Sequence, residues 1–99
     1  MFVSSSGQVG IGTTSPGSSY ADTLVVSASD EGGITLVSGV GHKAYLAFSD
    51  GHSGDDRFRG VVAYDHGTDA LQFYSNGVDR MYINSSGNVG IGTNAPNAM

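Results

Sequence analysis

The sequence predicts an all-β protein made of short strands with essentially no helix, and three observations lead to this prediction. No segment places its apolar residues at the 3.6-residue interval of a helix, whereas several short runs alternate apolar and polar residues or are β-branched. Clusters of glycine and polar residues separate these runs, and glycine supplies 16 of the 99 residues. One phrase also occurs twice. We therefore expect about seven or eight short strands, with at most a helical turn near residues 17–22.

The repeated phrase occupies residues 1–16 and 81–96. Ten of the 16 aligned positions are identical, and the other six exchange residues of similar size or polarity. Self-similarity at a fixed long interval is typical of modular arrays. We therefore interpret residues 1–99 as a single module, in which two copies of a boundary repeat enclose a central β region at 17–80.

Short predicted strands follow one another between the two copies. An Asn-Gly pair at Asn76 and Gly77 joins two alternating runs and predicts a type I′ hairpin turn, because both residues must adopt positive φ. The most polar segment, residues 50–57, is expected to be a surface loop. The runs with strand character are residues 24–26, 34–37, 43–48, 60–64, 70–74 and 78–83.

Each copy of the repeat contains Val-Gly-Ile-Gly, which predicts a strand with two unlike faces. Alternation places valine and isoleucine on one face and both glycines on the other, where another backbone can approach closely. Such a strand is weak in a monomer, but around a symmetry axis the apolar side chains of several chains can meet. The candidates for this shared core are Val9, Ile11, Met81, Ile83, Val89 and Ile91.

Composition restricts the partners of the chain. Nine acidic residues against four basic ones give a net charge of −5, which disfavours nucleic acid and anionic membranes as partners. No run of about 18 apolar residues is present, so we expect no membrane insertion. The chain has no cysteine and only four leucines and four isoleucines, so its core is thin and cannot be reinforced by disulfides. Oligomerisation is the usual remedy for a small chain of this kind.

Residues 80–93 resemble a phrase common in bacteriophage tail fibres and tailspikes, where it often precedes a C-terminal intramolecular chaperone. Residues 45–50, 60–66 and 71–77 resemble the same family, so the resemblance covers most of the chain. It implies an intertwined parallel homotrimer, a triangular β-prism or β-helix-like fibre module. No chaperone or autoproteolytic region is visible in these 99 residues, so that activity is not carried over.

The resemblance also implies a function. We expect a structural module of a virion tail fibre, extracellular when it works, that supports host-surface adhesion. Its partners would be two further copies of itself and the neighbouring fibre modules.

The alternative function is a carbohydrate-binding or receptor-binding module. Aromatic faces beside aspartate and arginine side chains suit sugar recognition, and loops on a rigid scaffold commonly carry binding residues. Ordinary cross-strand packing of the tyrosines is the competing interpretation. The candidates for contact with a host-surface glycan are Asp50, His52, Asp55, Asp56, Arg57, Arg59, Tyr64 and His66.

We expect no enzymatic activity. Residues 39–44 and 90–95 fit the Gly-x-Gly-x-x-Gly/Ala dinucleotide pattern, but that pattern requires a βαβ unit, which this chain is too short and helix-poor to form. No nucleophile elbow occurs, and no pair of carboxylates can be assigned to glycan hydrolysis.

We also expect no cofactor and no metal site. His42, His52 and His66 lack the spacing of a metal motif. Two alternatives stay open. A calcium loop could use Asp50, Asp55 and Asp56, and a trimer could bind an axial ion, because one residue near the axis would supply three ligands.

Overall fold

The computed structural model describes residues 1–97, which form eight strands and two short 3-10 helices. No α-helix occurs among these residues, so the all-β prediction is confirmed. The 3-10 helices are η1 (Pro16–Ser18) and η2 (Gly54–Phe58). The strands are β1 (Phe2–Val3), β2 (Val9–Ile11), β3 (Leu24–Val26), β4 (Lys43–Phe48), β5 (Gly60–Asp65), β6 (Ala70–Ser75), β7 (Val78–Ile83) and β8 (Val89–Ile91).

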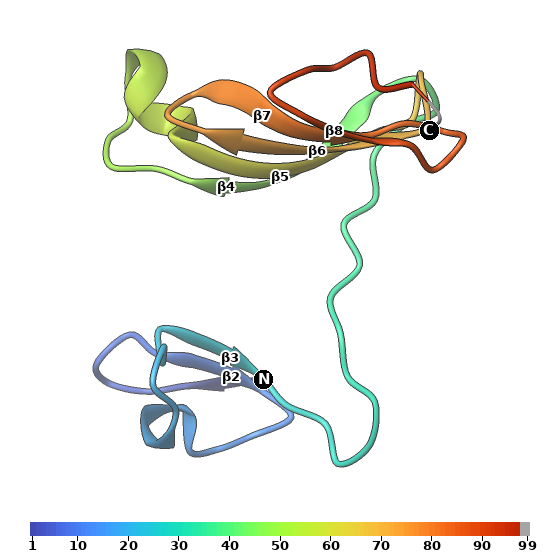
Figure 1. Cartoon of the computed structure of the whole chain (residues 1–99). Coiled ribbons are helices and arrows are strands. Elements are labelled where there is room, and N and C mark those ends of the chain that lie inside the picture. Colours follow the sequence, from blue (N-terminus) through green and yellow to red (C-terminus); the bar gives the residue numbers. More distant parts are fainter. Residues whose placement is uncertain (98–99) are drawn as a thin grey trace. The chain divides into compact units, whose positions relative to one another are not determined.

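The strands belong to two sheets, and the chain divides into two compact units between Thr35 and Leu36 (Figure 1). Unit 1 contains a three-stranded sheet in the order β1-β2-β3, in which β1 and β2 are antiparallel and β2 and β3 are parallel. Unit 2 contains a five-stranded sheet in the order β4-β5-β6-β7-β8. The boundary lies inside the region 17–80, and the single module over residues 1–99 stays a prediction about the assembled protein.

The sheet of unit 2 is an antiparallel meander in which every strand pairs with its neighbours in the sequence. The turn between β6 and β7 has φ of 54° at Asn76 and 73° at Gly77, so both residues adopt the positive φ expected of a type I′ turn. A bulge between Phe73 and Tyr74 shifts the register of β6 against β7. The predicted hairpin is therefore present.

The two copies of the repeat fold into the same hairpin. In the first copy Phe2 pairs with Gly10, and in the second Tyr82 pairs with Gly90. A backbone hydrogen bond closes the turn in the same way in each copy. The N–H of Ser4 donates to the carbonyl oxygen of Gln8 at 2.8 Å, and the N–H of the equivalent Asn84 donates to that of Asn88 at 3.0 Å. Sixteen similar residues at both ends of the chain thus specify one local structure.

The glycine face of each hairpin is approached by backbone, as expected, but the backbone comes from the same chain. A Cβ built at Gly90 would lie 2.5 Å from the carbonyl oxygen of Thr93, and one built at Gly10 would overlap the carbonyl oxygen of Thr13. The turn that follows each Val-Gly-Ile strand therefore folds back over it. Only glycine leaves room for this turn.

The strand predicted at residues 34–37 is wrong for the single chain. The segment forms no strand and lies between the last strand of one sheet and the first strand of the other (Figure 1). Its side chains are strongly exposed, with Ile34 at 66%, Leu36 at 51% and Val37 at 88%. β-Branched and apolar residues favour a strand only where a neighbouring strand completes the hydrogen-bond ladder, and no strand among the described residues does so here.

The core of one chain is very small. Among the described residues, Val61, Ala63 and Ala70 are the buried hydrophobic residues of the sheets, and Pro16 is buried in unit 1. Two of the three sheet residues are alanines, so little apolar area leaves water when one chain folds alone. The intertwined parallel homotrimer and its prism geometry stay predictions, because the structure describes one chain.

Candidate assembly face and receptor-binding loop

The sheet of unit 2 has one almost entirely apolar face. The strand register aligns one side chain from each of the five strands into a row that crosses the whole sheet, and a second row runs beside it on the same face. The first row is Leu46, Val62, Phe73, Met81 and Ile91, and the second is Ala44, Tyr64, Leu71, Ile83 and Val89. We call these two rows the apolar face.

The described part of unit 2 covers the apolar face incompletely: six of its ten side chains are half-buried, and the other four are exposed. Leu46 is 52% exposed, Val89 is 50% exposed and Ile91 is 81% exposed. Phe48, which alternates with Leu46 along β4 and continues the face, is 59% exposed. Contiguous apolar surface of this kind marks sites of protein association in soluble proteins.

Unit 1 repeats this arrangement on a smaller scale. Val3, Val9 and Leu24 form one row across its three strands, and Ile11 lies beside Val26 in the next. Val3 and Leu24 are more than half exposed, and Ile11 is 46% exposed. Each sheet therefore has one apolar side that is incompletely covered.

All six residues proposed from the sequence for a shared core lie on these two apolar surfaces. Val9 and Ile11 lie on the sheet of unit 1, and Met81, Ile83, Val89 and Ile91 lie together on the apolar face of unit 2. The sequence-based set omitted the residues of β4, β5 and β6 that share this face. Alternation in residues 43–48 and 70–74 indicates which side chains of one strand share a face. Only the register of the strands shows that this face is the one that carries the residues of the repeat. These additional residues are Leu46, Phe48, Val62, Leu71 and Phe73.

The opposite face of the same sheet combines small residues with tyrosines. Tyr45 and Tyr74 help to form a groove of about 410 Å³ above Val61 and Ala47, and η2 closes one end of it with Arg57 and Phe58. Tyr45 is 56% exposed, so an aromatic ring is available to a ligand there. Of the eight receptor-contact candidates, Arg57 is the one that lines this groove.

A polar cluster extends the groove face towards β7. The ammonium group of Lys43 lies 3.5 Å from the hydroxyl oxygen of Tyr74, and Asp79 pairs with Tyr74 across the strands. Burial alone lowers the pKa of Lys43, but its hydrogen bond to Tyr74 and nearby negative charge outweigh that effect, so the pKa is raised. Burial raises the pKa of Asp79, and attraction to Lys43 opposes part of that rise. This face is therefore polar as well as aromatic, unlike the apolar face.

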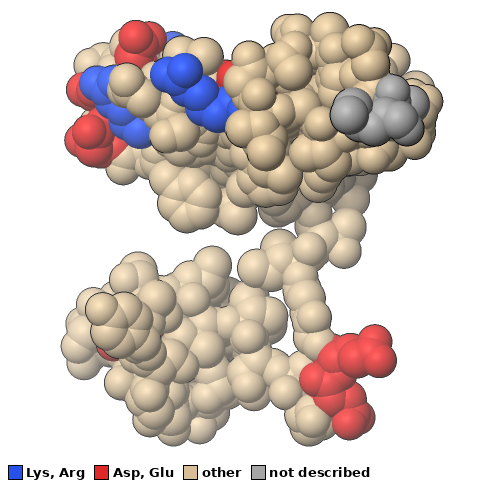
Figure 2. Space-filling view, in the orientation of Figure 1, with Lys and Arg blue, Asp and Glu red and all other residues tan. Residues whose placement is uncertain are grey.

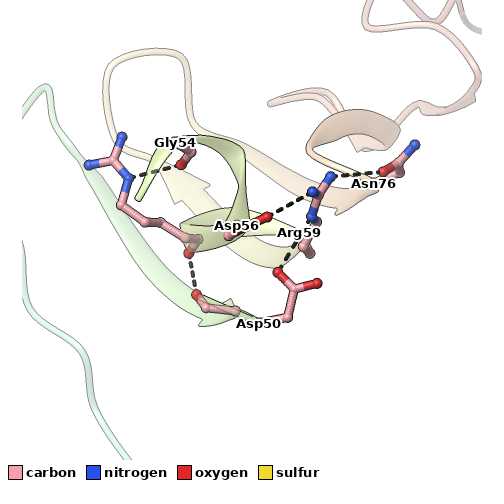
Figure 3. A network of polar contacts seen from close by, with 7 residues as sticks. Asp50, Gly54, Asp56, Arg59 and Asn76 are labelled. Atoms are coloured by element: carbon pink, nitrogen blue, oxygen red, sulfur yellow. Dashed lines mark hydrogen bonds and ion pairs between the residues drawn. The ribbon is translucent and has the colours of Figure 1, made fainter. Parts of the chain in front are cut away.

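The loop between β4 and β5 is organised around Arg59 (Figure 3). Its guanidinium group contacts Asp56 at 2.8 Å, the side-chain oxygen of Asn76 at 3.3 Å and Asp50 at 3.5 Å. The hydrogen bond with Asp56 raises the pKa of Arg59 above its ordinary value. All these groups are substantially exposed, so the network shapes the loop while adding little to global stability.

Further hydrogen bonds hold η2 against the end of β4. Arg57 donates from Nε to the carbonyl oxygen of Gly54 at 3.0 Å, and the hydroxyl of Ser49 donates to the carbonyl oxygen of Arg57. On the face seen in Figure 2, charged side chains gather at the end of unit 2 that carries η2. His52 and Asp55 are exposed on the same loop.

A calcium loop built on Asp50, Asp55 and Asp56 does not fit this geometry. The guanidinium group of Arg59 already occupies the space between two of the three carboxylates, where a cation would have to bind, and compensates one of their negative charges. Across residues 1–97, no three histidine, aspartate or glutamate side chains group closely enough to hold a metal ion.

Tyr64 and His66 lie at the opposite end of β5 from Arg59. Their rings meet edge to face with centroids 4.9 Å apart, and the Tyr64 hydroxyl contacts Asp69 at 3.3 Å. Burial, together with the charge of Asp69, raises the pKa of Tyr64. Five residues of extended strand separate Arg59 from Tyr64 by about 17 Å. The eight receptor-contact candidates therefore form two groups, with six at the loop and two at the far end of the strand.

No family model and no curated protein matches the sequence. The described part of the chain has no helix of the length and apolar character needed to cross a membrane. The function is therefore inferred from the faces of the sheets, the loop and the repeat.

Proposed function

We propose that the chain is a structural module of a phage tail fibre, that it works as a homotrimer and that it supports host-surface adhesion. The observation that carries this proposal is the apolar face of unit 2, on which Leu46, Val89 and Ile91 at the edges of the sheet are at least half exposed. Three copies around one axis can turn these faces inward and bury them against one another. Burying one large aliphatic or aromatic side chain contributes roughly 1.5–3 kcal/mol, so such a core greatly exceeds that of one chain.

The repeated hairpin supports the same proposal. Its two copies place valine and isoleucine on the apolar side of both sheets, so every copy contributes to a shared core. Neighbouring fibre modules that carry the same hairpin would continue this core along the axis. The role of the module is mechanical, as part of an extracellular rod on the virion, and the proposal includes no catalytic step.

The oligomeric state tests this proposal. Sedimentation equilibrium at several concentrations should show one species of three chains, each of 10.1 kDa. Binding of a dye that fluoresces on apolar surfaces should stay low, because the apolar faces are covered in the trimer. A folded monomer that persists at micromolar concentration contradicts the proposal.

A second candidate function rests on the groove on the opposite face. In a trimer with inward apolar faces, the groove beside Tyr45 and Tyr74 stays accessible on the outside. Tyrosine rings offer an apolar surface and a hydrogen-bonding group, and both suit a sugar ring. We therefore propose receptor glycan as the ligand of this groove, should the module bind a host directly.

A glycan array tests the second candidate. Tyr45→Ala should abolish glycan binding while leaving the trimer intact, because Tyr45 lies on the groove face. Tyr20→Ala is the matched control, since Tyr20 is a fully exposed tyrosine of unit 1. Binding that survives Tyr45→Ala, or no binding by the original chain, leaves the scaffold role alone.

A further inference from the structure

The two copies of the repeat differ at both edges: β7 pairs with β6, whereas the equivalent β1 is an edge strand, and the opposite edges of the hairpins differ as well. Strand β2 of the first copy has a neighbour on both sides, whereas β8 of the second copy pairs only with β7 in the described part of the chain. On its second side β2 binds β3 in parallel, with the N–H of Val9 donating to the carbonyl oxygen of Thr23 and the N–H of Ser27 donating to that of Ile11, both at 2.8 Å. Among residues 1–97, no strand takes the place of β3 beside β8.

The free edge of β8 has the same form as the occupied edge of β2. The N–H of Gly92 donates to the carbonyl oxygen of Arg80 at 2.8 Å, so the backbone hydrogen-bonding groups of Gly92 point towards the chain of β7. The backbone groups of Val89 and Ile91, which alternate with it, therefore point away from β7. A Cβ built at Gly92 meets nothing within 4 Å, whereas one at the equivalent Gly12 would overlap the carbonyl oxygen of Ser27. The space that β3 fills beside β2 is thus open beside β8.

The chain contains a second segment that shares three residues with the β3 region, although Ser38 follows it where β3 has Val26. Thr-Leu-Val occurs at residues 23–25, where it pairs with β2, and again at residues 35–37, and nowhere else. The second segment is the predicted strand that pairs with nothing in the described residues, and Leu36 and Val37 are both more than half exposed. One chain therefore has an unpaired Thr-Leu-Val segment and an unpaired copy of the edge that binds this sequence.

We propose that residues 35–37 of one copy pair in parallel with β8 of a second copy, as β3 pairs with β2 within one chain. The equivalent register places Leu36 opposite Val89 and Val37 opposite Gly90. Leu36 then extends the second row of the apolar face by one residue, in the position that Leu24 has beside Val9. The inference rests on the proposed function, because it assigns the contact between chains.

The reach of the chain favours a second copy over the same chain. Strands β4 and β8 are opposite edges of a five-stranded sheet, so the far side of β8 lies about five strand spacings, or about 24 Å, from β4. Six residues lead from Val37 to Lys43 at the start of β4, and fully extended they span at most about 21 Å. A segment held this close to β4 cannot also lie along the outer edge of β8.

Disulfide trapping tests this pairing, because the chain has no cysteine of its own. Leu36→Cys and Val89→Cys are made in separate chains, which are refolded together and oxidised. Both positions are about half exposed, so the variants should fold. Facing residues of neighbouring strands lie within the distance of a disulfide, and a product of two linked chains is expected on a non-reducing denaturing gel. A chain with both substitutions should give a ring of three chains, in which each chain is linked by a disulfide to the next.

Two controls fix the register and the topology. Val37→Cys mixed with Val89→Cys should give only background linkage, because these side chains lie on opposite faces of the inferred pair. Val9→Cys with Leu24→Cys in one chain should close a disulfide within that chain, because these residues pair in cis.

The outcomes separate this inference from the proposed function. Three-chain sedimentation without Leu36→Cys to Val89→Cys linkage overturns the pairing and leaves the trimer. Protection of the Val89 and Ile91 amides from hydrogen exchange in such an unlinked trimer shows that another segment fills the edge, which also overturns the pairing. If the chain with both substitutions forms the disulfide only within single chains, the pairing between two copies is overturned. A monomer in sedimentation overturns both proposals.

Discussion

The hairpins of the two copies are nearly identical in sequence and in register, yet their Val-Gly-Ile strands differ in position, because β2 is the middle strand of its sheet and β8 is an edge strand. The likeness comes from local chemistry, since the turn, the glycine positions and the alternation are the same in both. Within residues 1–97, β3 pairs with the first hairpin, and no equivalent strand pairs with the second. Local sequence thus determines the hairpin, and the rest of the chain determines which of its edges is satisfied.

The strongest test of this comparison introduces a charge on the shared apolar side of each copy. Ile91→Asp places a carboxylate in the first row of the apolar face, and three related carboxylates would meet in the trimer. An unpaired buried charge costs several kcal/mol, so we expect loss of the trimer in sedimentation. Ile11→Asp should act in the same direction with a smaller effect, because the apolar side of unit 1 is smaller. A trimer with an unchanged melting temperature contradicts the inward placement of Ile91.

The equivalent glycines Gly12 and Gly92 provide the sharpest matched pair. Both have positive φ, 78° and 76°, so alanine at either position costs about 1 kcal/mol in backbone strain. At Gly12 the new Cβ also overlaps the carbonyl of Ser27, which raises the expected loss to about 3 kcal/mol in urea unfolding. Within one chain Gly92→Ala lacks this second cost. If a partner strand fills the edge of β8, the cost should appear instead as weaker association of Gly92→Ala trimers.

Gly10 and Gly90 should behave alike, because the same turn crowds both. Alanine at Gly90 would bring its Cβ to 2.5 Å from the Thr93 carbonyl oxygen, and Gly10 has the same relation to Thr13. We expect a loss of about 2 kcal/mol for each substitution, measured by chemical unfolding followed through tyrosine fluorescence. A loss in only one of the two variants would show that the hairpins are not equivalent.

The smallest expected difference concerns the turn residues Gln8 and Asn88. The Gln8 amide donates to the carboxylate of Asp22 at 2.8 Å and so ties the first hairpin to the segment before β3. Gln8→Ala should therefore cost about 1 kcal/mol, the net contribution of a typical hydrogen bond, because partial exposure to water weakens the attraction to the charged acceptor. Asn88→Ala should have almost no effect, because the Asn88 side chain makes no such hydrogen bond to another segment of the described chain. Equal losses in thermal unfolding would contradict this explanation.

Much of the fold could be predicted because its signals are local. The alternation in residues 43–48 and 70–74, the Asn76–Gly77 turn and the repeated Val-Gly-Ile strand each depend on a few neighbouring residues. The parallel pairing of β2 with β3 could not be predicted, because Leu24 and Val26 have no feature that selects β2 over another strand. The segment at residues 34–37 has the composition of a strand, as β3 has. In one chain, however, it lacks the partner strand that β3 has.

The candidate site was predicted in part. The six residues taken from the repeat lie on the apolar sides of the two sheets, since alternation decides the face of a side chain, and their place in a shared core stays a prediction. The partners of Arg59 could not be foreseen, because Asn76 reaches it from a different hairpin. The separation of Tyr64 and His66 from the loop results from the direction of β5, which spacing along the chain does not show.

The meander of unit 2 has a consequence for the assembly that we propose. Every strand of this sheet pairs with its neighbour in the sequence, so its contacts are short-range and need little loop closure before they form. The sheet should therefore fold quickly on each new chain, earlier than any association between chains. Each chain then presents its apolar rows to water until others arrive, and a high local concentration of nascent chains would favour correct assembly over aggregation.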